Sequence, residues 1–97
     1  MSQFKGTAGR WSRNIAPATR YPTIFAGRNT HVAVVRSEGL TPEEVEANCN
    51  LITAAPDLFD AAHAAINCIV ELPQNQANSE VLKMLNAAIA KATGEQA

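Results

Sequence analysis

The segment LTPEEVEAN at residues 40–48 constrains the fold more than any other part of the sequence, because it has the features of a helix start. Thr41 fits the N-cap, Pro42 the first helical position, and Glu44 the returning half of a capping box. Glu43 adds negative charge at the positive end of the helix dipole. We therefore expect the chain to fold differently before and after this boundary.

Before the boundary, short runs rich in β-branched and aromatic residues predict strands at IFA (24–26) and HVAVVR (31–36). Residues 27–30 include a glycine and an asparagine, which tolerate positive φ and favour a hairpin between these strands. A further strand is expected within RWSRNIA at 10–16, ended by Pro17. The N-terminal part thus predicts a small antiparallel β-sheet of about three strands.

After the boundary, Val45, Cys49 and Ile52 repeat at helical spacing as far as Pro56. Proline inside a helix costs about 3 kcal/mol, because it lacks an N–H and crowds the carbonyl four residues earlier. We therefore expect the first helix to break near Ala54-Ala55 and to restart on Pro56.

The apolar stripe of the restarted segment is closed by Pro73, and a polar loop follows at 74–78. Asn78 or Ser79 is expected to cap a last helix, with Gly94 just past its end. The predicted fold class is α+β: an N-terminal antiparallel sheet followed by two main helices, the first broken at Pro56. We expect residues 1–97 to form a single domain.

The charges of the chain are strongly asymmetric. Residues 1–37 carry +6 and no acid, whereas residues 38–97 carry nine acids against two lysines, which gives −7. We therefore distinguish a basic β-sheet part at 1–37 from an acidic helical part at 40–94. This asymmetry is the clearest functional indication in the sequence.

Membrane insertion and catalysis find no support in the sequence. No segment approaches the roughly 18 to 20 apolar residues of a membrane span, and the N-terminus lacks a signal-peptide core, so a cytoplasmic protein is expected. Cys49 and Cys68 do not form a C-x-x-C pair, which favours buried free thiols. His31 and His63 have no other metal ligand at suitable spacing. We expect no enzyme, no cofactor and no metal.

Arginines of the basic part lie beside aromatic and amide side chains. An arginine pairs bidentately with phosphate and an aromatic ring stacks on a base, so these residues predict a site for an anionic nucleotide rather than for nucleic acid. An alternative interpretation is a solvated basic strand face, or arginines paired with acidic helices of the same or a neighbouring subunit. The predicted ligand-binding residues are Trp11, Arg13, Arg20, Tyr21, Arg28, Asn29 and Arg36.

The stretch ANCNLITAAPDLFDAA at 47–62 resembles the pattern A-N-A-x-L-I-x-A-A-P-x-L-L-x-A-L, found in many small proteins encoded by tailed phages and prophages. The ending AAIAKATGE is similar to the usual C-terminus of the same group. Cys49 replaces a common alanine and Phe59 a common leucine. The matching residues are Ala47, Asn48, Leu51, Ile52, Ala54, Ala55, Pro56 and Leu58.

The resemblance implies an accessory protein of a mobile element, and such proteins often counter host defences. The plan of a sheet followed by two helices also resembles the Thoeris anti-defence sponge family, which traps cyclic ADP-ribose-type signals in oligomers. The expected function is sequestration of an anionic, cyclic nucleotide immune signal by a homo-oligomer in the host cytoplasm. Two alternatives are an anti-CRISPR-type inhibitor that binds and blocks a host defence protein, and a structural or assembly accessory protein of the virion.

Overall fold

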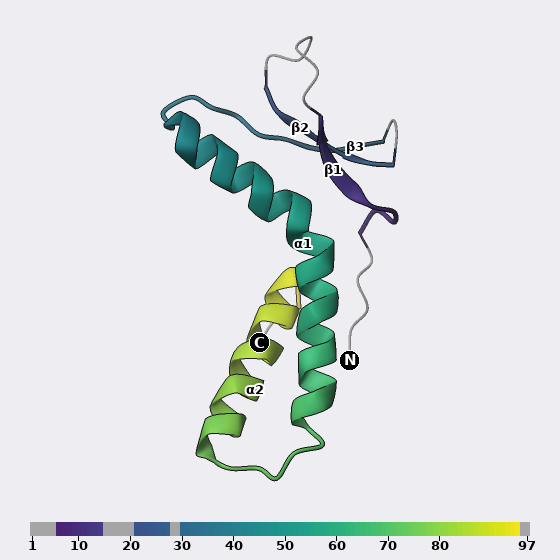
Figure 1. Ribbon diagram of the computed structural model, residues 1–97, viewed down its shortest axis with the longest axis vertical. Coiled ribbons are helices and arrows are strands. Elements are labelled where there is room, and N and C mark those ends of the chain that lie inside the picture. Colours follow the sequence, from purple (N-terminus) through teal and green to yellow (C-terminus); the bar gives the residue numbers. More distant parts are fainter. Residues whose placement is uncertain (1–5, 15–20, 28–29, 96–97) are drawn as a thin grey trace. The chain divides into compact units, whose positions relative to one another are not determined.

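The computed structural model describes residues 6–14, 21–27 and 30–95 of the chain. Along the chain, three strands precede two helices, which confirms the predicted α+β class (Figure 1). The described residues divide into two compact units, which we call the sheet unit (6–56) and the hairpin unit (57–95). The elements are β1 (Trp11–Asn14), β2 (Thr23–Ala26), β3 (Thr30–Val34), α1 (Pro42–Ile69) and α2 (Gln76–Ala92).

The sheet is antiparallel throughout, in the order β1-β2-β3. Arg13 pairs with Ile24 and Ile24 pairs with Ala33, and the register shifts between Ile24 and Phe25. Gly27 ends β2 with a φ of 64°, a conformation that suits glycine because it has no Cβ. The predicted strands and the hairpin between the second and the third are therefore confirmed.

The core of the sheet unit lies between the sheet and the first half of α1. Ile24 and Cys49 are fully buried, and Val35 and Val45 are nearly so. Val45 and Cys49 are four residues apart, so they face the sheet from the same side of the helix. Partly buried apolar residues pack around this cluster: Trp11, Val32, Ala33 and Ile52.

The predicted break at Pro56 is wrong, because α1 is one helix from Pro42 to Ile69 with Pro56 inside it. Pro56 leaves the Ile52 carbonyl without its helical hydrogen bond and crowds it, but both effects are confined to this one turn. The remaining backbone bonds and the buried residues on either side of the proline keep α1 helical. The boundary between the two units nevertheless falls directly after Pro56.

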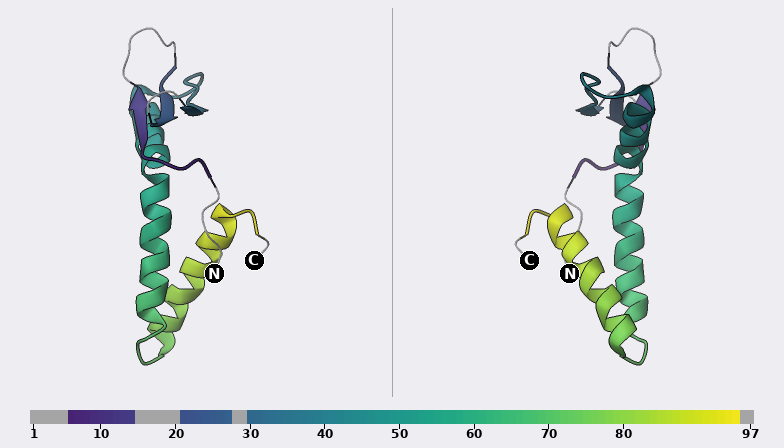
Figure 2. Two further views of the ribbon diagram at one scale, coloured as in Figure 1. Left: turned by 90° about the vertical axis from the view of Figure 1, so that its right-hand side faces the viewer. Right: turned by 90° about the vertical axis from the view of Figure 1, so that its left-hand side faces the viewer.

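In the hairpin unit, α2 runs back along the second half of α1 after a short connection at 70–75 (Figure 2). Phe59, Ile66 and Ile89 form its buried core. Ala62, Leu82 and Leu85 pack against this core and complete the contact between the two helices.

The start of α2 also differs from the prediction. Its N-cap is Asn75, whose side-chain oxygen accepts a 2.9 Å hydrogen bond from the Asn78 backbone N–H. Asn78 lies inside the first turn, and its side chain donates to the Pro73 carbonyl at 2.8 Å. At the other end, Gly94 follows the helix with a φ of 76°, as predicted.

Candidate functional site

An open cleft of ≈ 430 Å³ lies in the sheet unit, beside β1 and the start of α1. Arg13 of β1 contributes the positive charge among its described lining residues, and Glu46 of α1 the negative charge. The capping box at Thr41 and Glu44 fixes where α1 begins, and this boundary sets the position of Glu46 one turn later. The lining residues are Arg13, Ser37, Leu40, Pro42, Val45 and Glu46.

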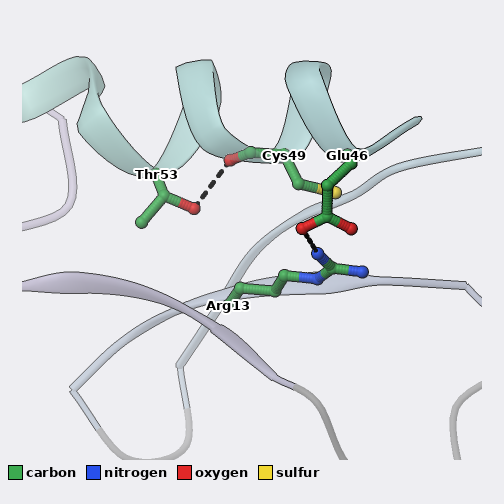
Figure 3. Close-up of polar contacts among 4 residues, drawn as sticks. All are labelled: Arg13, Glu46, Cys49 and Thr53. Carbon is green, nitrogen blue, oxygen red and sulfur yellow. Dashed lines mark hydrogen bonds and ion pairs between the residues drawn. The ribbon is translucent and has the colours of Figure 1, made fainter. Parts of the chain in front are cut away.

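Arg13 and Glu46 form an ion pair across this cleft, through Nη1 and Oε2 (Figure 3). The hydrogen bond to Glu46 raises the pKa of Arg13 above its usual value, and desolvation opposes this only in part. The Arg13 side chain is 27% exposed, and its buried Nε has no hydrogen-bond partner among the described residues. The guanidinium is therefore charged, partly accessible, and holds unused hydrogen-bonding capacity.

A side-chain hydrogen bond and a buried thiol lie in the part of α1 that follows Glu46. Thr53 Oγ1 donates a 2.7 Å hydrogen bond to the carbonyl of Cys49, one turn earlier in α1 (Figure 3). The side chain of Cys49 is fully buried in the core, so its thiol is not presented to the cleft as a nucleophile.

A second polar cluster joins three exposed or half-exposed residues of the sheet unit. The Tyr21 hydroxyl donates to Glu38 Oε2, and Arg36 Nε donates to Glu38 Oε1 at 3.1 Å. The Arg36 guanidinium also lies over the Tyr21 ring, 4.7 Å from its centroid. The hydrogen bond from Tyr21 and then that from Arg36 lower the pKa of Glu38. This cluster keeps Glu38 ionised and gives Arg36 an anionic partner.

Three of the predicted ligand-binding residues lie in these two places, and a fourth packs on the core. Arg13 lines the cleft, Tyr21 and Arg36 share the second cluster, and Trp11 packs on the core while its Nε1 donates to the Thr7 carbonyl at 3.0 Å. Arg20, Arg28 and Asn29 lie outside the described residues.

The sequence did not single out Glu46 and Glu38 as neighbours of the predicted arginines. The alternative interpretation, in which arginines pair with acidic helices, is confirmed for Arg13, because it pairs with Glu46 of α1. Glu46 belongs to α1, and the contact spans 33 residues of sequence, so no local pattern could identify this partner. Glu38 lies two residues from Arg36, and that spacing alone offered a signal for the second cluster.

The cysteines differ from expectation in one respect. Both are free thiols, but only Cys49 is buried, whereas Cys68 is exposed on α1. Across residues 6–14, 21–27 and 30–95, no group of three or more His, Cys, Asp or Glu side chains is arranged to hold a metal ion. In the same ranges, none of the helices has the length and apolar character that crossing a membrane requires.

Comparison with known proteins relates nearly the whole chain to a phage protein. The model of the family described as Salmonella phage P22 protein Y8K6 matches residues 1–96. Searches of curated proteins and of solved structures gave no match.

Proposed function

Since the chain belongs to the Salmonella phage P22 protein Y8K6 family, we propose that it is a phage protein that counters a host defence by binding rather than by catalysis. In this proposal it sequesters an anionic, cyclic nucleotide signal as a homo-oligomer in the host cytoplasm. The phage family supports the setting, and the cleft at Arg13 supports the kind of ligand.

The proposal rests on the ion pair between the Glu46 carboxylate and the Arg13 guanidinium within the cleft. The cleft volume of ≈ 430 Å³ lies in the range of small-molecule sites. A phosphate presents its oxygens to the planar arginine fork with the same bidentate geometry as a carboxylate. An incoming phosphate would take the place of Glu46, so ligand binding would compete with the internal ion pair.

This competition predicts opposite effects for the two partners. We expect Arg13→Ala to abolish calorimetric binding of cyclic ADP-ribose, because the phosphate loses its cation. Glu46→Gln should instead strengthen binding, because the competing charge is removed while the side-chain shape is kept. Arg10→Ala serves as the matched control, since it removes an exposed arginine one residue before β1 that does not line the cleft.

Equal affinities in the wild type, Arg13→Ala and Glu46→Gln would contradict a site at this cleft. Native mass spectrometry of the protein purified from infected cells adds an unbiased measurement, because it reports co-purified nucleotide together with the oligomer mass. If neither method detects a nucleotide, the ligand class proposed here is wrong.

Direct blockade of a host defence protein is the second candidate. It is supported by the pairing of both Arg13 and Arg36 with carboxylates of the chain itself, and by Leu51 of α1, which is 63% exposed. Affinity capture from a defended host, followed by mass spectrometry, distinguishes the candidates. A stable complex with a host protein and no heat with nucleotide would favour blockade. A protein found in purified virions would point to the assembly role.

A further inference from the structure

The second half of α1 has apolar residues on two adjoining stripes. The first stripe includes Phe59 and Ile66 and packs against α2. Each residue of the second stripe precedes one of the first by a single position, which turns it by about 100° around the helix. Leu58 is 52% exposed, and Ala61 and Cys68 are also exposed. The second stripe consists of Leu58, Ala61, Ala65 and Cys68.

The same arrangement recurs on α2. Its packed stripe includes Leu82, Leu85 and Ile89, and a second stripe again lies one position earlier. Met84 is 70% exposed and Val81 is 45% exposed. All four residues of this second stripe are exposed: Ala77, Val81, Met84 and Ala88.

Both second stripes lie on the same side of the hairpin. The two helices run antiparallel (Figures 1 and 2), and the residues of their packed stripes belong to one buried cluster. On each helix, a residue one position earlier in the sequence points about 100° away from the packed stripe. Because the helices run in opposite directions and their packed stripes face each other, this rotation brings both second stripes to the same side of the hairpin. We call this side the hairpin face.

The two edges of the hairpin face differ in charge. One further position outwards on α1 lie Asp57 and Asp60, and the corresponding positions on α2 include Lys83. Lys91, seven residues after Met84, lies at the border between this α2 edge and the hairpin face. Glu80 also lies on the α2 edge, closer to the connection between the helices, at a level where α1 carries no charged residue. The apolar face is therefore flanked by an acidic edge on α1 and, on the half of α2 farther from the connection, by Lys83 and Lys91.

We propose that the hairpin face binds the same face of a second copy of this chain, so that two hairpins form a four-helix bundle. A two-fold axis parallel to the helices places α1 of each copy on α2 of the other. It also sets Asp57 and Asp60 beside Lys83 and Lys91 of the second copy. Stacking α1 on α1 would instead bring the acidic edges together. The charges thus favour a second copy of the chain as the partner and α1 on α2 as the arrangement. This inference rests on the proposed function, because it specifies the interface of the proposed homo-oligomer.

The mass of the protein in solution tests the interface. Sedimentation equilibrium of the wild type should give twice the 10.3 kDa chain mass at high concentration. Met84→Glu places a charge at the centre of the face and should weaken dimerisation by at least about tenfold. Asn86→Glu adds the same charge to an exposed site of α2 that points away from the face, and should leave the dimer unchanged.

Charge reversal tests the arrangement. Asp60→Lys should weaken the dimer, and adding Lys83→Glu to it should restore affinity by recreating the pair with opposite sign. A stack of α1 on α1 predicts the reverse for Asp60→Lys, which would then relieve repulsion and strengthen the dimer. That result would overturn the arrangement proposed here.

Cys68 reports on the face without any substitution. It lies on the apolar stripe, so its reaction with a thiol reagent should slow as the protein concentration rises, while Cys49 stays unreactive in the folded protein. A wild-type monomer at every concentration, with constant Cys68 reactivity, would overturn this interface. If that monomer still bound nucleotide, binding at the cleft would stand without the homo-oligomer; a dimer without nucleotide affinity would refute sequestration alone.

Discussion

Arg13 of the edge strand β1 and Glu46 of α1 form an ion pair that joins the sheet to the helix within the sheet unit (Figure 3). The two side chains are 27% and 55% exposed, so water and dissolved ions reach at least the carboxylate. Pairs with this degree of exposure contribute little to stability, because solvent screens their attraction. The pair therefore leaves Arg13 available to another anion at small cost to the fold.

A double-mutant cycle with Arg13→Ala and Glu46→Gln tests this conclusion. We expect a coupling free energy of about 0.2–1 kcal/mol at low ionic strength, decreasing in high salt. Denaturant unfolding of the four proteins at two salt concentrations measures it. A coupling several times larger, or one insensitive to salt, would mean that the pair is structural and not exchangeable.

The capping box at Thr41 yields a prediction about stability. The Thr41 hydroxyl accepts a 3.1 Å hydrogen bond from the Glu44 N–H, and Glu44 Oε1 accepts a 2.9 Å bond from the Thr41 N–H. Thr41→Ala should lower the free energy of unfolding by about 0.5–2 kcal/mol, because the helix loses its side-chain cap. Thr41→Ser keeps the hydroxyl and should be nearly neutral. Equal losses in both variants would show that the cap itself is unimportant.

Elements with local signatures were predictable from the sequence, and contacts between distant segments were not. The capping box, the hairpin and the Val45–Cys49 stripe each depend on residues a few positions apart, and the structure confirms them. Predicting the contact of Arg13 with Glu46 requires the docking of α1 on the sheet, which is a tertiary property. The sequence could therefore propose Arg13 as a site residue but not the cleft that surrounds it.

The N-cap of α2 and the burial of Cys68 were predicted wrongly from the sequence. Asn75 and Asn78 both suit a helix cap, and Asn75 is the cap because the Asn78 side chain bonds the Pro73 carbonyl instead. Cys68 was expected to be buried, but its position lies one residue outside the stripe that packs on α2. Local hydrogen bonds decided the position of the cap, and the packing of α2 on α1 decided the exposure of Cys68.

Tyr21 gives a spectroscopic prediction, because it is the single tyrosine of the chain. Its hydrogen bond to Glu38 is the main cause that raises the pKa of the phenol above 10.0. Since the protonated form is favoured in the folded state, the stabilisation is present below pH 10.0 and is lost as the pH rises through the shifted pKa. Absorbance titration of the phenolate should show a raised midpoint, which Glu38→Gln lowers towards the ordinary value. The same midpoint in both proteins would contradict this hydrogen bond.

Pro56 provides the last prediction, because it lies inside a continuous helix. Pro56→Ala supplies an N–H for the Ile52 carbonyl and removes the ring's clash, which together cost about 3 kcal/mol in a helix. The greater freedom of alanine in the unfolded chain offsets about 0.4–1 kcal/mol of this gain. We therefore expect a higher Tm and greater helical circular dichroism, whereas Ala55→Gly at the neighbouring position should cost about 1 kcal/mol. If Pro56→Ala lowers the Tm as Ala55→Gly does, the fold needs the proline at the boundary between its two units.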